Sequence, residues 1–380
     1  MEPRPIFHWK KGLISTNGSI KRYLSKRLVI IAPYPKGEAP SQRFRFEQYL
    51  DFFEEQDYTI EFHAFLSDKT WKALYKEGSF FAKASGMIGS FWRRFLLMFK
   101  LRSADVIFIH REASMIGPPV FEWIIAKVLR KKFIYDFDDA IWLPNYSDSN
   151  ARFQRLKAYG KVKKIMKWAH VVSAGNQHLL EFAKQYNENV RIIPTTIDLE
   201  NSHNLSTLHS AKVPVIGWTG THTTMGYLDD LIPVLAELEN THTFVFRIIS
   251  NQAPEYDLKS LEFVKWNKET EIEDLAKINI GVMPLLDTIW AKGKCGFKGL
   301  QYMALEIPAV MSPVGVNTSI VEDGINGFLC STPEEWKQTF VKLLESESLR
   351  VEIGKAGSQT VQQSYSVQAN RNNYLNLLKS

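Results

Sequence analysis

The sequence predicts an α/β fold with two doubly wound parallel sheets, one in each half of the chain. Short apolar runs such as LVIIA at 28–32 have the length and composition of strands buried on both faces of a parallel sheet. Helical patterns separate most of these runs, which is typical of Rossmann-like domains. The alternation stops in a polar, weakly patterned stretch at 195–212 and then starts again, so two such domains are expected.

Each half contains its own series of expected strands. Those of the first half lie at 28–32, 58–65, 105–110, 132–138, 170–174 and 190–194. Those of the second half lie at 213–220, 243–250, 263–266, 278–285 and 307–313. Helical patterns at 333–363 and 368–380 follow. These elements predict an N-terminal extension at 1–26, a first domain at 27–198, a second domain at 199–363 and a C-terminal helix at 364–380.

The composition suits two domains of ordinary size, since 45% of the 380 residues are hydrophobic. The net charge of +6 favours anionic partners such as nucleotides, phospholipid surfaces and lipid-linked phosphates. We find no nucleic-acid-binding motif in the sequence, so nucleic acid is not an expected partner. Cys295 and Cys330 have neither metal-ligand spacing nor a disulfide framework. Without a recognisable signal peptide or membrane-spanning run, we expect a cytoplasmic protein.

One helical segment, at 86–102, combines aromatic and basic side chains without any acid. Its large apolar residues are interspersed with four basic ones and include Trp92, Phe95, Leu96 and Phe99. A helix of this kind either lies in a lipid interface or packs on the sheet with a solvated basic face. Both interpretations stay open at this point, and with them a peripheral location at the inner face of a membrane.

The segment 290–329 has the pattern of a phosphate-binding site. Gly296 ends a glycine-containing loop, and the helix expected at about 297–305 begins next to it. A helix start offers free N–H groups and a partial positive charge. Lys292, Lys294 and Lys298 cluster around this start, which suits a diphosphate. Gln301 lies three residues after Lys298 and therefore shares its helix face.

A second glycine loop, Gly315-Val316-Asn317, follows the strand expected at 307–313. Ligands bind at the carboxyl ends of strands in open α/β sheets, so we expect both loops at one binding site. Trp290 precedes the first loop and is a candidate to stack on a base or a sugar.

These loops, with their spacing, resemble the donor site of glycosyltransferase family 4, a group 1 family with the GT-B fold. The resemblance covers most of 27–365 and is stronger in the second half. The residues that carry it are Gly296-Phe297, Met303-Ala304, Pro308 to Ser312, Gly315 and Asp323-Gly324-Ile325-Asn326-Gly327-Phe328.

The resemblance implies an acceptor domain and a nucleotide-sugar donor domain that face each other across a cleft, with the final helix returning to the first domain. It implies hexosyl transfer from a nucleotide sugar to a hydroxyl of a saccharide or lipid-linked acceptor, with retention, in polysaccharide or glycolipid assembly. The nucleotide sugar is a substrate, and no cofactor or metal is expected. Lys298 and the helix start would stabilise the leaving diphosphate, which then takes the acceptor proton.

The donor half departs from the family pattern in two places. The family usually carries two glutamates separated by seven residues, and Gly293 and Gln301 stand at these positions here. Gln301 can still bind ribose hydroxyls, whereas Gly293 has no side chain to contact the donor sugar. The loop at 217–224 lacks the usual arginine and lysine, so backbone N–H groups near Gly220 and the hydroxyl of Thr221 are the candidates to bind the diphosphate.

The candidates in the first half end predicted strands or open its first helix. His110 resembles the histidine at a strand end of the family, and either contacts the donor or is a buried structural residue. Asp138 either orients the acceptor hydroxyl or caps a helix. Arg43, Arg45 and Arg111 are the candidates for acceptor binding, with a solvated helix face as the alternative for the first two.

Two other functions stay open. The missing glutamates also fit a nucleotide-sugar-binding subunit of a polysaccharide assembly complex that lacks transfer activity. Asp136 and Asp138 also resemble the Asp-x-Asp metal site of the other main glycosyltransferase fold. This resemblance would indicate a metal-dependent transferase.

Overall fold

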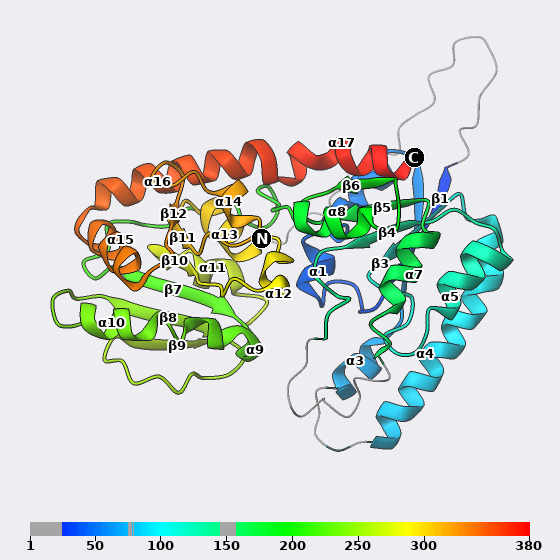
Figure 1. Ribbon diagram of the computed structural model, residues 1–380, viewed down its shortest axis with the longest axis horizontal. Coiled ribbons are helices and arrows are strands. Elements are labelled where there is room, and N and C mark those ends of the chain that lie inside the picture. The colour runs from blue at the N-terminus through cyan, green and yellow to red at the C-terminus, as the bar shows by residue number, and fades with distance from the viewer. Residues whose placement is uncertain (1–24, 75–77, 79, 145–156) are drawn as a thin grey trace, which may run out of the picture.

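The computed structural model describes residues 25–74, 78, 80–144 and 157–380, and it contains two α/β domains side by side (Figure 1). Within these described ranges, each domain is built around one six-stranded sheet. The prediction of two doubly wound parallel sheets is confirmed. Of the expected N-terminal extension, residues 1–24 lie outside the described residues.

The first sheet has the strand order β2-β1-β3-β4-β5-β6, with parallel pairing throughout. Residues 28–32 of the central strand β1 are almost completely buried, because helices cover both faces of the sheet. The strands are β1 (Lys26–Ala32), β2 (Tyr58–Ala64), β3 (Val106–His110), β4 (Ile134–Phe137), β5 (Val171–Ala174) and β6 (Val190–Ile192).

Two layers of helices cover this sheet. One layer packs its apolar side chains on the first core and consists of α4 (Phe80–Lys100), α5 (Val120–Trp123) with the π-helical turn η3 (Ile124–Val128), α7 (Lys161–Trp168) and α8 (Gln177–Lys184). The opposite face is covered by the short helices η1 (Glu47–Tyr49) and α2 (Leu50–Glu55) and by α17 (Val367–Leu378). Among the described residues, this domain also contains α1 (Pro40–Arg43), α3 (Asp68–Leu74) and η2 (Leu101–Ser103).

The second sheet has the order β12-β11-β10-β7-β8-β9 and is also parallel. Its central strands are buried on both sides, as the continuous apolar runs predict. The strands are β7 (Val215–Gly220), β8 (Val245–Ser250), β9 (Leu261–Lys265), β10 (Ile280–Met283), β11 (Ala309–Met311) and β12 (Phe328–Leu329).

Helices again form a layer on each face of the second sheet. One core includes residues of α11 (Glu271–Leu275), α13 (Phe297–Ala304), α14 (Asn317–Ile320) and η6 (Val361–Tyr365). The other includes residues of η5 (Gly226–Leu228), α10 (Ile232–Leu238) and α15 (Pro333–Glu345). The domain also contains α9 (His222–Met225), α12 (Ile289–Lys292) and α16 (Glu347–Thr360).

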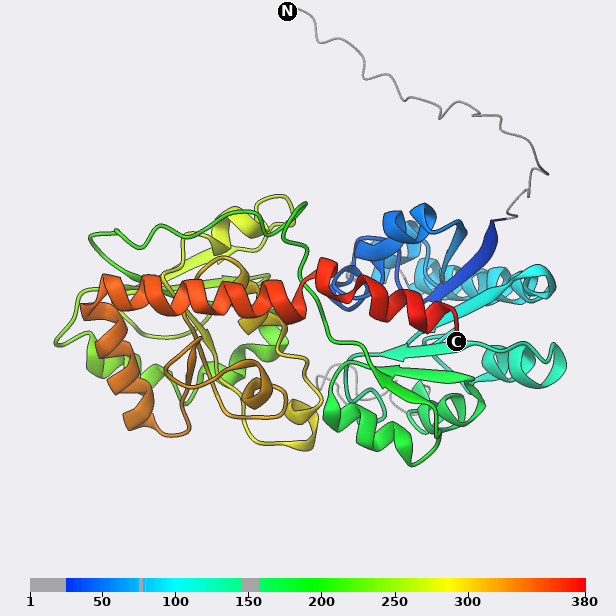
Figure 2. The same cartoon turned by 90° about the horizontal axis from the view of Figure 1, so that it is seen from above.

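The chain crosses between the domains twice, and the two crossings lie side by side. Ile197 on the first crossing forms an isolated parallel bridge with Ser366 on the second. After this point α17 runs along the first domain, as Figure 2 shows in red, and the ring of Tyr374 lies 4.3 Å from that of Tyr49. The last helix therefore joins the core of the first domain.

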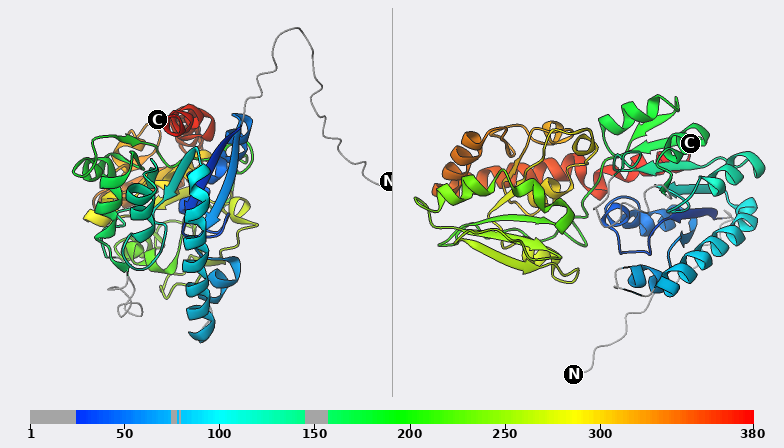
Figure 3. Two further views of the ribbon diagram at one scale, coloured as in Figure 1. Left: turned by 90° about the vertical axis from the view of Figure 1, so that its right-hand side faces the viewer. Right: turned by 60° about the horizontal axis from the view of Figure 1, so that its bottom comes forward.

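Residues 86–100 of the helical segment expected at 86–102 belong to the longer helix α4, and its last two residues belong to η2. Figure 3 shows α4 on the side of the first domain that faces away from the second. None of the described helices combines the length and the apolar character needed to cross a bilayer.

Candidate active site

The start of α13 is set by a glycine with a left-handed backbone. Gly296 has φ of 68°, and a Cβ at this position would overlap the side chain of Ile320. A non-glycine residue would thus be strained and would also clash. No side chain caps this helix start, so its first N–H groups remain available to a ligand.

Lys298 lies in the first turn of α13, close to the end of β7. Its Nζ is 4.2 Å from the ring centroid of Trp218, and a Cβ on Gly220 would come within 2.9 Å of the same nitrogen. Burial, with a smaller effect from Lys294, lowers the pKa of Lys298 to about 7. No carboxylate among the described residues raises this pKa. The helix start therefore carries a cation whose charge an incoming phosphate would stabilise.

The other two lysines of the predicted cluster are paired with acids. Nζ of Lys294 lies 3.1 Å from Asp139 of the first domain and 4.9 Å from the ring centroid of Trp290. Nζ of Lys292 lies 3.0 Å from Asp287 at an exposed position. Of the three lysines, Lys298 is thus the one whose charge is left uncompensated in the described structure.

The two glycine loops touch each other, as expected from their positions after β10 and β11. A Cβ on Gly315, which has φ of 59°, would lie 2.9 Å from the backbone oxygen of Lys292. Val316 and Asn317 are the neighbours of Gly296. Asn317 is buried and donates from Nδ2 to the backbone oxygen of Ser312 at 2.9 Å.

Two further donor-side candidates differ in exposure. Thr221 is exposed after β7, and its hydroxyl lies 2.8 Å from that of Thr223. Gln301 is buried, and its Nε2 lies 3.3 Å from Nε2 of His203. Burial, followed by the charge of Arg43, lowers the pKa of His203 to about 3, so this imidazole is neutral and accepts the amide hydrogen bond.

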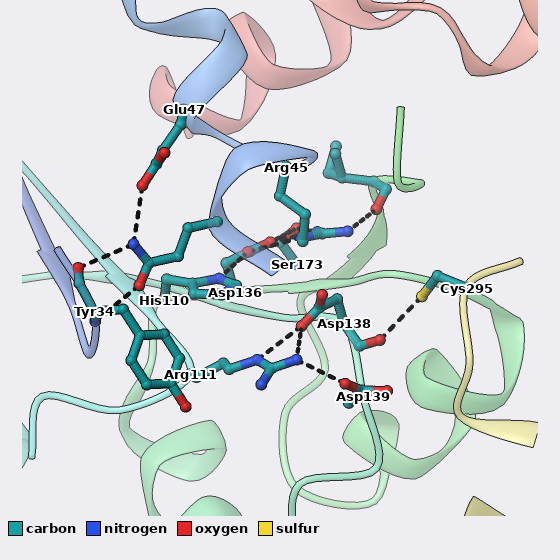
Figure 4. Close-up of polar contacts among 12 residues, drawn as sticks. Tyr34, Arg45, Glu47, His110, Arg111, Asp136, Asp138, Asp139, Ser173 and Cys295 are labelled. Atoms are coloured by element: carbon teal, nitrogen blue, oxygen red, sulfur yellow. Dashed lines mark hydrogen bonds and ion pairs between the residues drawn. The ribbon is translucent and has the colours of Figure 1, made fainter. Parts of the chain in front are cut away.

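In the first domain, His110 belongs to a buried ionic network at the ends of β3 and β4 (Figure 4). Asp136 lies 2.7 Å from Nδ1 of His110 and forms a two-point ion pair with Arg45. Ser173 donates to the same carboxylate at 2.7 Å. Burial opposes ionisation of Asp136, but Arg45 and His110 outweigh it and hold the pKa well below its usual range.

The network fixes the ring of His110. Because Asp136 is ionised, Nδ1 is assigned as the protonated nitrogen, and Nε2 finds no hydrogen-bond partner among the described residues. A buried nitrogen without a partner costs free energy unless a ligand or a water completes its bond. His110 is thereby held in one orientation, and its Nε2 is buried without a partner among the described residues.

Arg111 and Asp138 form a second cluster next to this network. Arg111 has φ of 57° and lies 2.7 Å from the carboxylates of both Asp138 and Asp139. Asp139 also accepts from Lys294, so it joins two cations of different domains. Burial opposes ionisation of Asp139, whereas Lys294 and Arg111 favour it and lower the pKa.

The first glycine loop of the second domain docks directly on the first domain. Nδ2 of Asn176 donates to the backbone oxygens of Lys292 and Lys294 at 3.2 and 2.8 Å. The thiol of Cys295 lies 3.1 Å from the backbone oxygen of Asp138, as Figure 4 shows. The structure therefore brings the donor-side loop and the ends of β4 and β5 together at one place.

Gly293 permits a further close approach between the domains. A Cβ at this position would lie 2.8 Å from Cβ of Ala140, which belongs to the first domain. The residue that replaces the usual glutamate is therefore a contact between the domains.

The acceptor-side arginines are not gathered on one open surface. Arg45 is fully buried in the Asp136 network, where a ligand could reach it only after that ion pair broke. Arg43 lies 2.9 Å from Glu271 of the second domain. Beside it, the ring of Phe44 lies 4.2 Å from that of Phe297. Both arginines thus hold parts of the protein together.

The two carboxylates considered as metal ligands are already occupied. Asp136 is paired with Arg45 and His110, and Asp138 with Arg111. In the described part of the chain, no group of three or more His, Cys, Asp or Glu side chains has the arrangement of a metal site.

Three residues of this region were not predicted. Trp218 was visible only as part of a strand, although it lies under Lys298. Asn176 caps α8 by accepting from Leu179, which is an ordinary role, and its second role across the domains has no local signal. Cys295 was noted only for its lack of a partner cysteine.

Part of the chain matches a known protein family. The family profile described as "Glycosyl transferases group 1" matches residues 213–346, which include both glycine loops. No curated protein sequence matches the chain.

Several solved structures share the fold across nearly the whole chain. Sucrose-phosphate synthase from Thermosynechococcus elongatus is 12% identical, with a TM-score of 0.68 over 93% of this chain and 98% of that one. A glycosyltransferase from Rickettsia africae is 14% identical, with a TM-score of 0.66 over 94% and 98%. HepE from Anabaena, solved with UDP and glucose, is 14% identical, with a TM-score of 0.63 over 93% and 99%. The chain has the GT-B fold, and its residues 213–346 match the family model of the group 1 glycosyl transferases.

Proposed function

We propose that the protein is a hexosyltransferase that moves a sugar from a nucleotide sugar to a hydroxyl of a saccharide or lipid-linked acceptor. The reaction proceeds with retention, needs no metal or cofactor, and serves polysaccharide or glycolipid assembly at the cytoplasmic face of a membrane. The family match over the donor half and the neighbour solved with UDP support a nucleotide-sugar donor.

The observation that carries this proposal is the uncompensated charge of Lys298 at the uncapped start of α13. The ammonium group of Lys298 is buried there without an acidic partner. Burial lowers its pKa, so keeping this lysine protonated costs free energy in the empty protein. A bound diphosphate would remove that cost, and its oxygens would also accept hydrogen bonds from the N–H groups at the helix start. Gly220 keeps a side chain away from Nζ of Lys298.

The chemistry follows from this charge. As the bond from the anomeric carbon to the diphosphate oxygen lengthens, negative charge grows on the leaving group beside Lys298, where it is stabilised more than in the ground state. The departing phosphate accepts the proton of the attacking hydroxyl, so no strong protein base is needed. We further propose that Nε2 of His110, which is buried and unpaired in the empty protein, contacts the donor after the site rearranges to admit it. The docked domains exclude water that would otherwise hydrolyse the donor.

Isothermal titration with UDP and other nucleoside diphosphates tests the proposal. Lys298→Met should weaken diphosphate binding about 10- to 100-fold, the worth of one hydrogen bond to a charged group. Lys355→Met, which removes an exposed lysine from α16, is the matched control and should bind as the wild type does. Equal affinities for both variants would remove the basis of the assignment.

A nucleotide-sugar-binding subunit without transfer activity is the second candidate. It is favoured by Gly293, because this position is filled by the contact with Ala140 and offers no carboxylate to the donor sugar. Tight UDP binding together with no release of UDP from any nucleotide sugar, in the presence of membranes that contain acceptor, would support the subunit and contradict the enzyme.

A further inference from the structure

The helix α4 has two apolar stripes, and only one of them is used inside the protein. Leu97 and Met98 pack on the first core, as does Leu101 of the adjoining η2. The opposite stripe is exposed: Trp92 and Phe99 retain 62% and 66% of their accessible surface. The other members of this stripe are Ile88, Phe95 and Leu96, which are also exposed. An exposed apolar stripe of this size is typical of an interaction site.

The neighbouring helix extends the apolar surface. Val120, Trp123 and Val128, on α5 and η3, are each about half exposed. Between α4 and α5 lies a groove of about 420 Å³ that is lined by apolar side chains only: Ile88, Phe91, Trp92, Phe95, Val120, Phe121 and Ile124. We call these exposed side chains and this groove the α4–α5 surface. It lies on the side of the first domain that faces away from the second (Figure 3).

Within α4, η2, α5, η3 and α7, the exposed charged side chains are basic. No Asp or Glu occurs in α4, η2 or α7, and the one acid of α5 and η3, Glu122, is buried and accepts from the N–H of Ala113. The exposed cations of these five elements and of the turn after η3 are Arg93, Lys100, Arg102, Lys127, Arg130, Lys132, Lys163, Lys164 and Lys167. Aromatic side chains with a basic margin are the combination that binds an anionic lipid interface.

We propose that the α4–α5 surface docks the protein on a bilayer that contains anionic lipids. Trp92, Trp123 and Phe99 enter the interface between head groups and acyl chains, the apolar groove takes an acyl chain, and the cations contact lipid phosphates. A second copy of this chain is a poor occupant, because a two-fold contact would bring the cations of one copy against those of the other.

Membrane docking would also place the acceptor, and this consequence rests on the proposed function. The inner side of α4 contributes Arg93, Arg94 and Leu97 to a cavity of about 400 Å³ that also contains Lys36 and His63, beyond the carboxyl ends of β1 and β2. A protein bound through α4 would thus present the acceptor side of the first domain next to the lipid head groups. The docking itself needs no sugar transfer and is tested without it.

The test is flotation of the full-length protein with vesicles of phosphatidylcholine alone or with added phosphatidylglycerol. We expect binding to the anionic vesicles and its loss at high salt. Trp92→Ser combined with Phe99→Ser should lower the partition coefficient at least tenfold, since each ring removes a large buried apolar area. Lys127→Glu and Arg130→Glu should each lower it roughly fivefold or more.

Leu208→Ser is the matched control, because Leu208 is a strongly exposed apolar residue outside the α4–α5 surface. It should float as the wild type does. Equal loss in this control, or equally weak binding to both vesicle types, would overturn the proposal. So would a concentration-dependent increase in mass that Trp92→Ser abolishes, because it would identify a second copy as the occupant.

Titration with UDP in the same variants separates the two proposals. If vesicle binding is lost while UDP binding persists, the fold is intact and the surface is assigned correctly. If the wild type floats but binds no nucleoside diphosphate, the proposed function fails and the docking surface stands.

Discussion

The protonation of Lys298 provides a quantitative prediction for the donor site. Its pKa is about 7 in the empty protein, and a bound diphosphate should raise it toward or above the ordinary value. Diphosphate binding is then coupled to proton uptake. We expect the affinity for UDP to fall as the pH rises above 7, because a growing fraction of the empty protein must first bind a proton.

The size of this effect follows from the pKa. At pH 7 about half of the Lys298 side chains are protonated, and at pH 9 about one in a hundred. If only the protonated form binds, the affinity for UDP falls by about fiftyfold between these pH values. This range avoids pH 6, near which the terminal phosphate itself titrates.

Isothermal titration with UDP at pH 7, 8 and 9, in buffers of different ionisation enthalpy, measures both the affinity and the proton uptake. Lys298→Arg is the matched variant, because a guanidinium remains charged throughout this range, and its binding should lose the pH dependence. A wild-type affinity that stays constant from pH 7 to 9, without proton uptake, would refute the reasoning.

The same pKa predicts that Lys298→Met stabilises the empty protein against unfolding. The folded pKa lies below the unfolded value of 10.5, so the charged lysine opposes folding fully below pH 7, and the effect fades as the pH rises from 7 to 10.5. Thermal unfolding without ligand should therefore show a higher midpoint for the variant at pH 6.5, by a few degrees, and a smaller difference at pH 10. A variant that is less stable than the wild type at pH 6.5 would show that Lys298 has a partner in solution.

Three shorter predictions concern the contacts between and within the domains. Asp136→Asn leaves a buried arginine without its anion and should lower the free energy of unfolding by about 3 to 5 kcal/mol, measured with urea. Gly293→Ala introduces a Cβ at 2.8 Å from that of Ala140 and should lower kcat while UDP binding changes little; Gly226→Ala, where the nearest atom is 3.6 Å away, is the control and should leave both unchanged. Because Asp136 and Asp138 are paired with arginines, turnover in excess chelator should equal turnover without it, and a loss restored by a divalent cation would contradict this.

The fold could be predicted because its signals are local. Each buried strand is a short apolar run, and each glycine loop precedes a helix within a few residues. Gly296 and Gly315 have left-handed backbones, which glycine adopts without strain. The two glycines in the sequence therefore indicated both loops. The start of α13 at Phe297 follows from the same pattern.

The charged residues could not be placed in the same way. Arg45 stands among polar residues at the start of the first domain, where the sequence indicates equally a ligand contact and a solvated face. Its true partner, Asp136, is 91 residues away, and the pair forms only when β4 and the segment after α1 come together. Cys295 and Asn176 likewise contact backbone oxygens of the other domain, and no side-chain pattern in the sequence encodes such a contact.

The distribution of charge suggests why Lys298 rather than Lys294 should dominate donor binding. Arg111, Lys294, Asp138 and Asp139 form a cluster with two cations and two anions, so the edge of the first domain is neutral where it meets the donor loop. Moving Lys294 to a diphosphate would expose Asp139 to the same anion, which cancels much of the gain. Lys298 has no such competitor among the described acids, so a bound diphosphate would not share its ammonium group with a carboxylate. Domain docking is thus stabilised by one set of charges, and the proposed reaction would use another.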